Sequence, residues 1–114
     1  MERLRRRADF LAAAKAPWRA RPTVVVQRRA RGDAGPPRLG FTATRKVGNA
    51  VRRNRAKRRL RAAAREVLHT VAEPGTDYVL IARPTTPDCD WERLLDDLRA
   101  ALQRLAHRSG DPVP

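Results

Sequence analysis

The side chains that could do chemistry in this chain are the cations of one short segment. Ten arginines and lysines fall between positions 45 and 65, and no acidic residue lies between Asp33 and Glu66. Guanidinium groups bind phosphate oxygens in pairs and stack on nucleobases, so a dense row of them favours a nucleic-acid partner. The row comprises Arg45, Lys46, Arg52, Arg53, Arg55, Lys57, Arg58, Arg59, Arg61 and Arg65.

The same segment has the apolar spacing of an amphipathic helix. At about 100° per residue, one sector of the helix is apolar, and most of the cations gather opposite it with Asn54 beside them. Like charges three or four residues apart destabilise an isolated helix, which indicates that a polyanion supplies the missing negative charge. The apolar stripe comprises Val51, Ala56, Leu60, Ala63, Val67 and Val71.

Local signals give the ends of this helix and the elements around it. Asn49 is the predicted N-cap and Val71 the approximate last residue. A short first helix is predicted from Ala8 to about Ala16, where Pro17 ends it. A last helix, with leucines and one alanine on its apolar side, follows a cap at Asp88 or Asp90. Its core residues are Leu94, Leu98, Ala101, Leu102 and Leu105.

Three strands are predicted between the helices. The strands at 23–27 and 38–44 are expected to pair as an antiparallel hairpin. The strand at 78–82 is apolar on both faces and should therefore be central and covered. The stretch 18–21 has room for one more short strand. Together these elements predict a single α+β RNA-binding domain over 1–114, with a basic arm at 1–7 and a frayed tail at 108–114.

Composition excludes several classes of protein. Lys and Arg number 26 against 12 Asp and Glu, and the resulting charge of +14 favours nucleic acid or, less often, an anionic membrane. The lone Cys89 excludes an intrachain disulfide and a cysteine-cluster metal site, and it fits a reducing, cytoplasmic compartment. No apolar window is long enough to span a bilayer. Asp96 and Asp97 are predicted to lie on a solvated helix face, and no catalytic constellation is visible.

The run from Lys46 to Arg58 resembles the signature of the bacterial ribonuclease P protein subunit. Its core is Arg53-Asn54-Arg55, followed after one residue by Lys57-Arg58. The likeness extends to a Leu-Gly-Phe strand upstream, an Asp-Phe pair in the first helix, an Asp-Tyr-Val-Leu-Ile-Ala-Arg strand downstream and the leucine-spaced last helix. It covers roughly residues 4 to 105.

This resemblance implies a fold and a function. The fold is an α-β-β-β-α-β-α sandwich with a left-handed β-α-β crossover, similar to the second domain of ribosomal protein S5, although general handedness rules favour a right-handed connection. The implied function is to join a catalytic ribonuclease P RNA and remove the 5′ leader of precursor tRNA. The RNA and its Mg²⁺ ions would perform the cleavage. The protein is expected to need no cofactor, no catalytic residue, no membrane and no obligate protein partner.

The resemblance also implies which residues contact RNA. They lie on the basic helix and just before it, and Asn54 could hold a phosphate-bound water or a hydrated Mg²⁺ in its outer shell. The predicted RNA-binding residues are Arg45, Lys46, Asn49, Arg52, Arg53, Asn54, Arg55, Lys57, Arg58, Arg61 and Arg65.

A second predicted surface is a cleft for the single-stranded leader. Phe10 matches a cleft aromatic on which a base stacks, and the alternative is that Phe10 packs between helix and sheet. Members of the family usually carry two further aromatics, where this chain has Ala14 and Gln27, so Trp18 is the candidate substitute. The cleft is expected to be lined by Phe10, Val25, Gln27, Thr42 and Thr44.

Two other functions are compatible with the basic helix. The first is a general structural RNA-binding domain of the ribosomal-protein type, without a role in processing. The second is non-specific recognition of DNA or an anionic membrane. All three functions predict steep salt dependence, whereas only the ribonuclease P subunit should prefer RNA with a single-stranded 5′ extension in the presence of its partner RNA.

Overall fold

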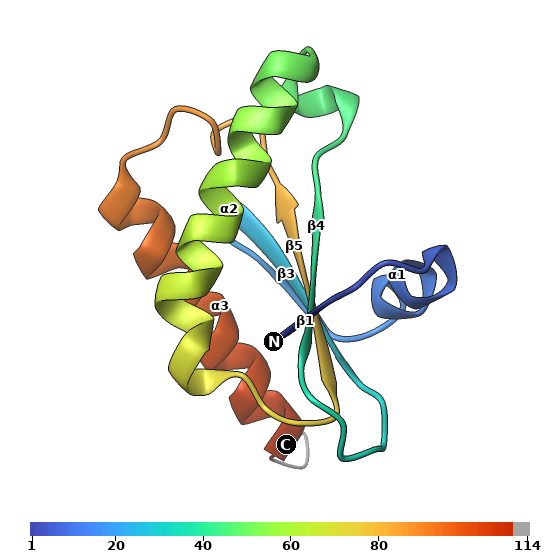
Figure 1. Cartoon of the computed structure of the whole chain (residues 1–114). Coiled ribbons are helices and arrows are strands. Elements are labelled where there is room, and N and C mark those ends of the chain that lie inside the picture. The colour runs from blue at the N-terminus through green and yellow to red at the C-terminus, as the bar shows by residue number, and fades with distance from the viewer. Residues whose placement is uncertain (111–114) are drawn as a thin grey trace.

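This computed structural model describes the backbone of residues 1–110 and the side chains of residues 1–106. Within them, a mixed sheet is covered by α-helices on both faces (Figure 1). The helices are α1 (Arg7–Ala14), α2 (Ala50–Val71) and α3 (Trp91–Gly110), with a 3₁₀ turn η1 (Arg45–Val47) before α2. The strands are β1 (Glu2–Arg3), β2 (Trp18–Ala20), β3 (Val24–Ala30), β4 (Arg38–Thr42) and β5 (Thr76–Ala82).

The sheet has the strand order β1-β4-β5-β3-β2, with β5 at its centre. β5 lies parallel to β4 and antiparallel to β3. The prediction of a hairpin between the strands now seen as β3 and β4 is therefore wrong. β5 is apolar on both faces and gains a neighbour on each side and a helix layer on each face by lying between them. Its predicted central position is confirmed.

The connection from β4 through α2 to β5 is left-handed, as the resemblance implies (Figure 1). Parallel crossovers are right-handed in about 98% of cases, so composition and periodicity alone favour the wrong hand. The short strand expected near Trp18 is present as β2, paired antiparallel with β3. The implied order α-β-β-β-α-β-α is confirmed, with β1 added before it.

The two faces of the sheet bury different sets of side chains. Tyr78, Leu80 and Ala82 of β5 point to the main core under α2 and α3. Val79, on the opposite face, joins Leu4 and Ala13 in a smaller cluster under α1. This alternation follows from the two-residue period of a strand. Each face of the central strand thus holds a different helix layer in place.

The predicted boundaries of α2 are confirmed, whereas its predicted apolar stripe is confirmed only in part. The Asn49 side-chain oxygen accepts a 3.0 Å hydrogen bond from the Arg52 backbone NH, which caps the helix. Ala56 and Leu60 are fully buried, but Val51 and Val71 are 74% and 52% exposed. Val51 lies in the first turn of α2, which reaches beyond the sheet (Figure 1), and Val71 is the last residue of the helix. Ala64 and Leu68 complete the buried side instead.

The N-terminal segment, predicted as a basic arm over 1–7, is docked on the sheet. Glu2 and Arg3 pair in parallel with β4, and the Leu4 backbone NH donates a 2.7 Å hydrogen bond to Leu39. Leu4 is only 3% exposed, because its side chain packs with Ala13 and Val79 between α1 and the sheet. At the other end, α3 includes residues 108–110 of the predicted tail, and residues 111–114 lie outside the described part.

The last helix has the predicted core. Leu94, Leu98, Ala101, Leu102 and Leu105 are all buried. Of the two proposed caps, Asp90 is the one used, since its carboxylate accepts a 3.2 Å hydrogen bond from the Arg93 backbone NH. Asp88 binds arginines of α2 instead.

Candidate nucleic-acid interface

The turn into α2 sets the position of the basic surface. Gly48 has a φ of 138°, which favours glycine, and a Cβ at this position would lie 2.8 Å from the Arg52 Cδ atom. The chain therefore reverses between η1 and α2. Arg45 and Lys46 lie exposed on η1, beside the first turns of the helix.

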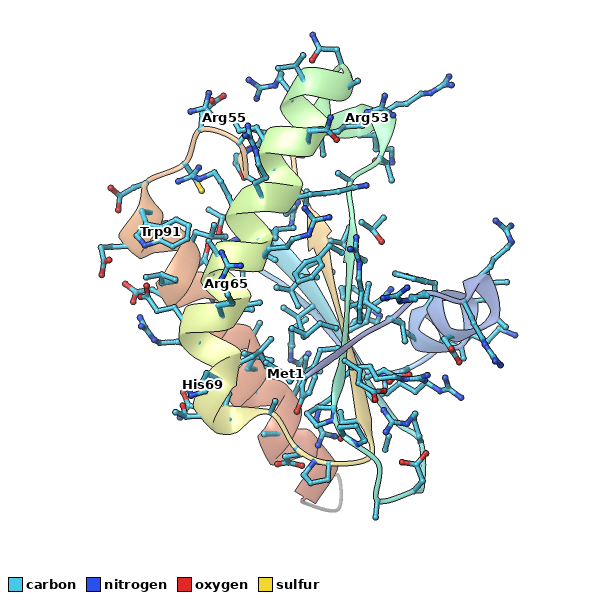
Figure 2. All side chains as sticks on the ribbon, viewed as in Figure 1. Met1, Arg53, Arg55, Arg65, His69 and Trp91 are labelled. Atoms are coloured by element: carbon cyan, nitrogen blue, oxygen red, sulfur yellow. The ribbon has the colours of Figure 1, made fainter. Side chains whose placement is uncertain are left out.

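The cations of α2 surround the helix on several sides. Figure 2 shows Arg53 on the side of η1 and Arg55 on the opposite side, above the segment that joins β5 to α3. Arg58 and Arg65 are exposed, and Asn54 is exposed between the first two arginines in sequence. The helix can therefore contact phosphates along more than one line, as a double-stranded or folded RNA would require.

Two of these arginines are bound within the protein. The Arg59 guanidinium donates hydrogen bonds to the carbonyls of Thr86 at 2.7 Å and Cys89 at 2.6 Å, and it lies over the Trp91 ring at 5.7 Å. Arg52 donates to the Val47 carbonyl at 3.3 Å and to the Asp88 carboxylate at 2.8 Å. Both side chains hold the segment between β5 and α3 against α2. Arg52 therefore stabilises the fold, in addition to being a predicted RNA contact.

One acidic side chain approaches the N-terminal half of α2 in the described part of the chain. The Asp88 carboxylate lies 2.8 Å from Arg52 and 3.8 Å from Arg55. The hydrogen bond from Arg52, followed by the charges of Arg52, Arg55 and Arg59, holds the pKa of Asp88 below its ordinary value. Asp88 stays ionised, but a single carboxylate leaves most of the helix charge uncompensated.

Seven of the predicted RNA-binding cations have no acidic partner among the side chains that the structure describes. Arg61 lies over the Phe41 ring at 5.7 Å, and the other six make no ion pair. These cations are available to a polyanion without the loss of a protein salt bridge. They are Arg45, Lys46, Arg53, Lys57, Arg58, Arg61 and Arg65.

Strand register places three of the predicted leader-cleft residues on one sheet face. Thr42 and Val25 both pair with Ile81, so these three side chains form a half-buried row across β4, β5 and β3. Gln27 lies one position away on the same face of β3, opposite Trp18 of β2. Thr44, by contrast, is exposed beyond the end of β4, at the beginning of η1.

The aromatic side chains of this face have different environments. A Cβ built on Gly40 would lie 2.6 Å from the Phe10 ring, so Phe10 rests directly on β4. Phe10 therefore packs between helix and sheet, as the alternative interpretation holds, while part of its surface stays exposed. Trp18 is 57% exposed. Directly opposite residues of antiparallel strands share a face, which places Trp18 beside Gln27.

A buried ion network that the sequence did not reveal holds α1 against this face. Asp77 of β5 is fully buried and accepts hydrogen bonds from Arg38 at 2.8 Å and Arg31 at 2.7 Å. Asp9 of α1 lies 3.3 Å from Arg29 and 3.4 Å from Arg38. Burial raises the pKa of Asp77, but the hydrogen bonds from Arg38 and Arg31 outweigh burial and leave it lowered. The sequence signal for this network is Asp77 itself, an acidic residue in an otherwise largely apolar strand.

A second buried carboxylate corrects the prediction that Asp97 lies on a solvated helix face. Asp97 is 1% exposed and accepts hydrogen bonds from the Thr23 backbone NH at 3.2 Å and hydroxyl at 2.7 Å. The helical phase of α3 puts Asp97 beside Leu94 and Leu98 on the side that faces the sheet. The carboxylate therefore anchors α3 to the beginning of β3.

The described residues contain neither a metal centre nor a membrane span. No three His, Cys, Asp or Glu side chains within residues 1–106 come close enough together to hold a metal ion. No helix within residues 1–110 combines the length and apolar character needed to cross a membrane. What the described surface offers is a concentration of unpaired cations on η1 and α2. The fold and this surface define an α+β nucleic-acid-binding protein.

Comparison with known proteins identifies the family. The sequence model of the ribonuclease P family matches residues 1–106. The ribonuclease P protein component of Caulobacter vibrioides is 59% identical over 106 residues, which cover 92% of this chain and 71% of that protein. The Ruegeria pomeroyi protein is 55% identical over 105 residues, covering 90% and 84% of the two chains.

Solved structures agree with the sequence comparison. The RNase P protein of Staphylococcus aureus superposes with a TM-score of 0.74 at 28% identity, covering 91% of this chain and 94% of that one. The Thermotoga maritima protein gives 0.73 at 31% identity, covering 91% and 97%. The chain belongs to the bacterial ribonuclease P protein family. Its function is that of the protein subunit of ribonuclease P, in the processing of tRNA 5′ ends.

Proposed function

We propose that η1 and α2 bind the ribonuclease P RNA and that this complex removes the 5′ leader of precursor tRNA in the cytoplasm. The observation that carries the proposal is the set of seven cations without an acidic partner. When such side chains bind phosphates, counterions condensed on the RNA are released, which favours binding. No ion pair of the protein has to be broken for this.

The RNA and its Mg²⁺ ions perform the hydrolysis in this proposal, and the protein contributes binding and position. Asn54 is exposed on α2, next in sequence to Arg53 and Arg55. Its amide can both donate and accept hydrogen bonds, so it suits a hydrated Mg²⁺ or a phosphate-bound water beside the arginine contacts. The protein needs no cofactor, membrane or obligate protein partner of its own.

The single-stranded leader is proposed to lie on the sheet face beside α1. Thr42, Val25 and Gln27 supply small and polar contacts there, and Trp18 supplies an exposed ring at the far edge. Stacking of bases on aromatic rings tolerates any sequence, which suits a leader that differs between tRNA genes. Phe10, held on Gly40, can offer only its exposed part.

The test is single-turnover cleavage of a precursor tRNA by a bacterial ribonuclease P RNA at low Mg²⁺. Stoichiometric protein is expected to restore cleavage, because it supplies binding that high Mg²⁺ otherwise provides. The Arg53→Ala/Arg55→Ala variant should restore little. Arg104→Ala, which removes one exposed cation of α3, is the matched control and should behave like the wild type. Tight RNA binding without restored cleavage would contradict the proposal and favour a structural RNA-binding role.

A further inference from the structure

We propose that a groove between α2 and the β1–β4 edge of the sheet receives one unpaired nucleotide of a bound RNA. This inference rests on the proposed function and adds a site to it. The groove encloses about 200 Å³, lies on the sheet face opposite α1 and is separate from the proposed leader surface. It is lined by Met1, Glu2, Arg3, Leu39, Phe41, Arg61 and Arg65.

The floor of the groove is apolar and carries an aromatic ring. Leu39 and Phe41 point from β4 toward the main core but stay half-buried at its margin. Met1, at the end of the docked N-terminal strand, is 53% exposed. An exposed methionine beside a half-buried phenylalanine is apolar surface that the protein itself does not cover. The small volume of the groove suits a single planar base and excludes a base pair.

The rim of the groove is cationic. Arg61 and Arg65 project from α2, and Arg3 projects from β1 in register with Leu39. None of these three arginines makes an ion pair in the described part of the chain. Glu2 is the one acid of the lining, and its register partner is Arg38, whose side chain points to the other face with Asp77. Positive charge around an apolar floor complements a nucleotide, whose phosphate is anionic and whose base is apolar on its faces.

Arg61 is already arranged for this ligand. Its guanidinium lies over the Phe41 ring at 5.7 Å, and Phe41 is the only described ring that it contacts. A planar guanidinium can bind a phosphate through its edge while its face stays on a ring or a base. Arg53, Lys57, Arg61 and Arg65 follow one another at four-residue intervals, about 6 Å of helix rise each. They form a row of cations that leads along α2 into the groove.

The experiment measures the affinity of the full chain for three RNA hairpins by fluorescence anisotropy at one salt concentration. The hairpins are identical except that one is fully paired, one has a single bulged adenosine, and one has an abasic site at the bulge. The wild type is expected to bind the adenosine bulge about tenfold more tightly than the other two, within the range measured for one stacked base. The abasic hairpin separates stacking from any effect of a bend in the RNA.

Three variants locate the effect. Phe41→Leu keeps the floor apolar and removes the ring, and Arg61→Gln removes the cation while leaving the core intact. Each should abolish the preference for the adenosine bulge. Arg58→Gln, on the exposed side of α2, should weaken binding to all three hairpins by the same factor. Arg61→Gln decides the matter if Phe41→Leu proves unstable in a thermal unfolding control.

The outcomes separate the groove from the proposed function. Equal binding of the three hairpins by the wild type would overturn the groove and leave RNA binding by α2 intact. A preference that survives both groove variants would place the nucleotide elsewhere and would also overturn it. Failure to bind any hairpin would contradict RNA binding itself, and the groove with it.

Discussion

Neighbouring arginines on α2 have different roles because their environments differ. Arg59 donates to two backbone carbonyls of the segment between β5 and α3, whereas Arg58 is exposed and makes no ion pair among the described side chains. A carbonyl that loses a charged donor in a partly buried site loses a bond that water replaces poorly. The two residues therefore separate stability from RNA affinity within one turn of helix.

Substitution of Arg59 should reduce stability, and substitution of Arg58 should not. We expect Arg59→Ala to lower the free energy of unfolding by about 1.5–3 kcal/mol, the range for hydrogen bonds to charged groups. Arg58→Ala should change it by less than about 0.5 kcal/mol, as exposed substitutions do, while weakening RNA binding. Urea denaturation followed by circular dichroism measures both. Equal stability of the two variants would contradict the role of Arg59.

At the scale of elements, a close contact and an ion network add to the apolar packing that holds α1 on the sheet. Phe10 rests on Gly40, and Asp9 lies near Arg29 and Arg38, which flank the buried Asp77. The helix has only eight residues, too few to be stable alone, so these contacts fix its position. The position of α1 in turn bounds the proposed leader surface.

Gly40→Ala tests this contact. The added Cβ would lie 2.6 Å from the Phe10 ring, so the helix must shift, and we expect a loss of about 1–3 kcal/mol, typical of overpacking. Phe10→Ala removes the ring and should also destabilise. The double variant should be more stable than the sum of the two effects predicts, because the new methyl group occupies vacated space. Additive losses in urea denaturation would show that the two residues do not share this contact.

At the scale of the whole molecule, two buried carboxylates link segments that are far apart in the chain. Asp77 is bound by Arg38 and Arg31, and Asp97 joins α3 to Thr23. For Asp97, burial raises the pKa, but the Thr23 hydroxyl and amide, followed by Arg93 and Arg21, leave it below its ordinary value. A carboxylate with a lowered folded-state pKa stabilises the fold above its unfolded value of about 3.9 and loses that contribution as pH falls further.

Stability should therefore decline in acid. We expect a nearly constant free energy of unfolding from pH 7 to about pH 5 and a fall below about pH 4, as Asp77 and Asp97 take up protons. Asp97→Asn should be less stable than the wild type at pH 7 but should lose less between pH 5 and pH 3. Urea denaturation at a series of pH values measures both curves. Asp96→Asn, on the exposed side of α3, controls for the substitution, and parallel curves for Asp97→Asn would contradict the role of this carboxylate.

The features of this protein that depend on residues close together in the chain can be predicted from the sequence. The helix at 50–71 and its cap at Asn49 follow from contacts three or four residues apart, and the central strand follows from apolar residues on both of its faces. The cations of α2 are equally a property of the local sequence. The resemblance carried by Arg53-Asn54-Arg55 supplied the family and the left-handed crossover, which no local rule gives.

Contacts between residues far apart in the chain become visible in the folded structure and not before. β5 lies between β3 and β4, so the expected hairpin does not form. Val51 is exposed because α2 reaches beyond the sheet there, whereas Asp97 is buried because α3 lies against Thr23. The groove beside Phe41 exists because the N-terminal strand docks on β4. In each case the physical reason is the same: burial and pairing depend on what another segment places opposite a residue, and the periodicity of one segment does not contain that information.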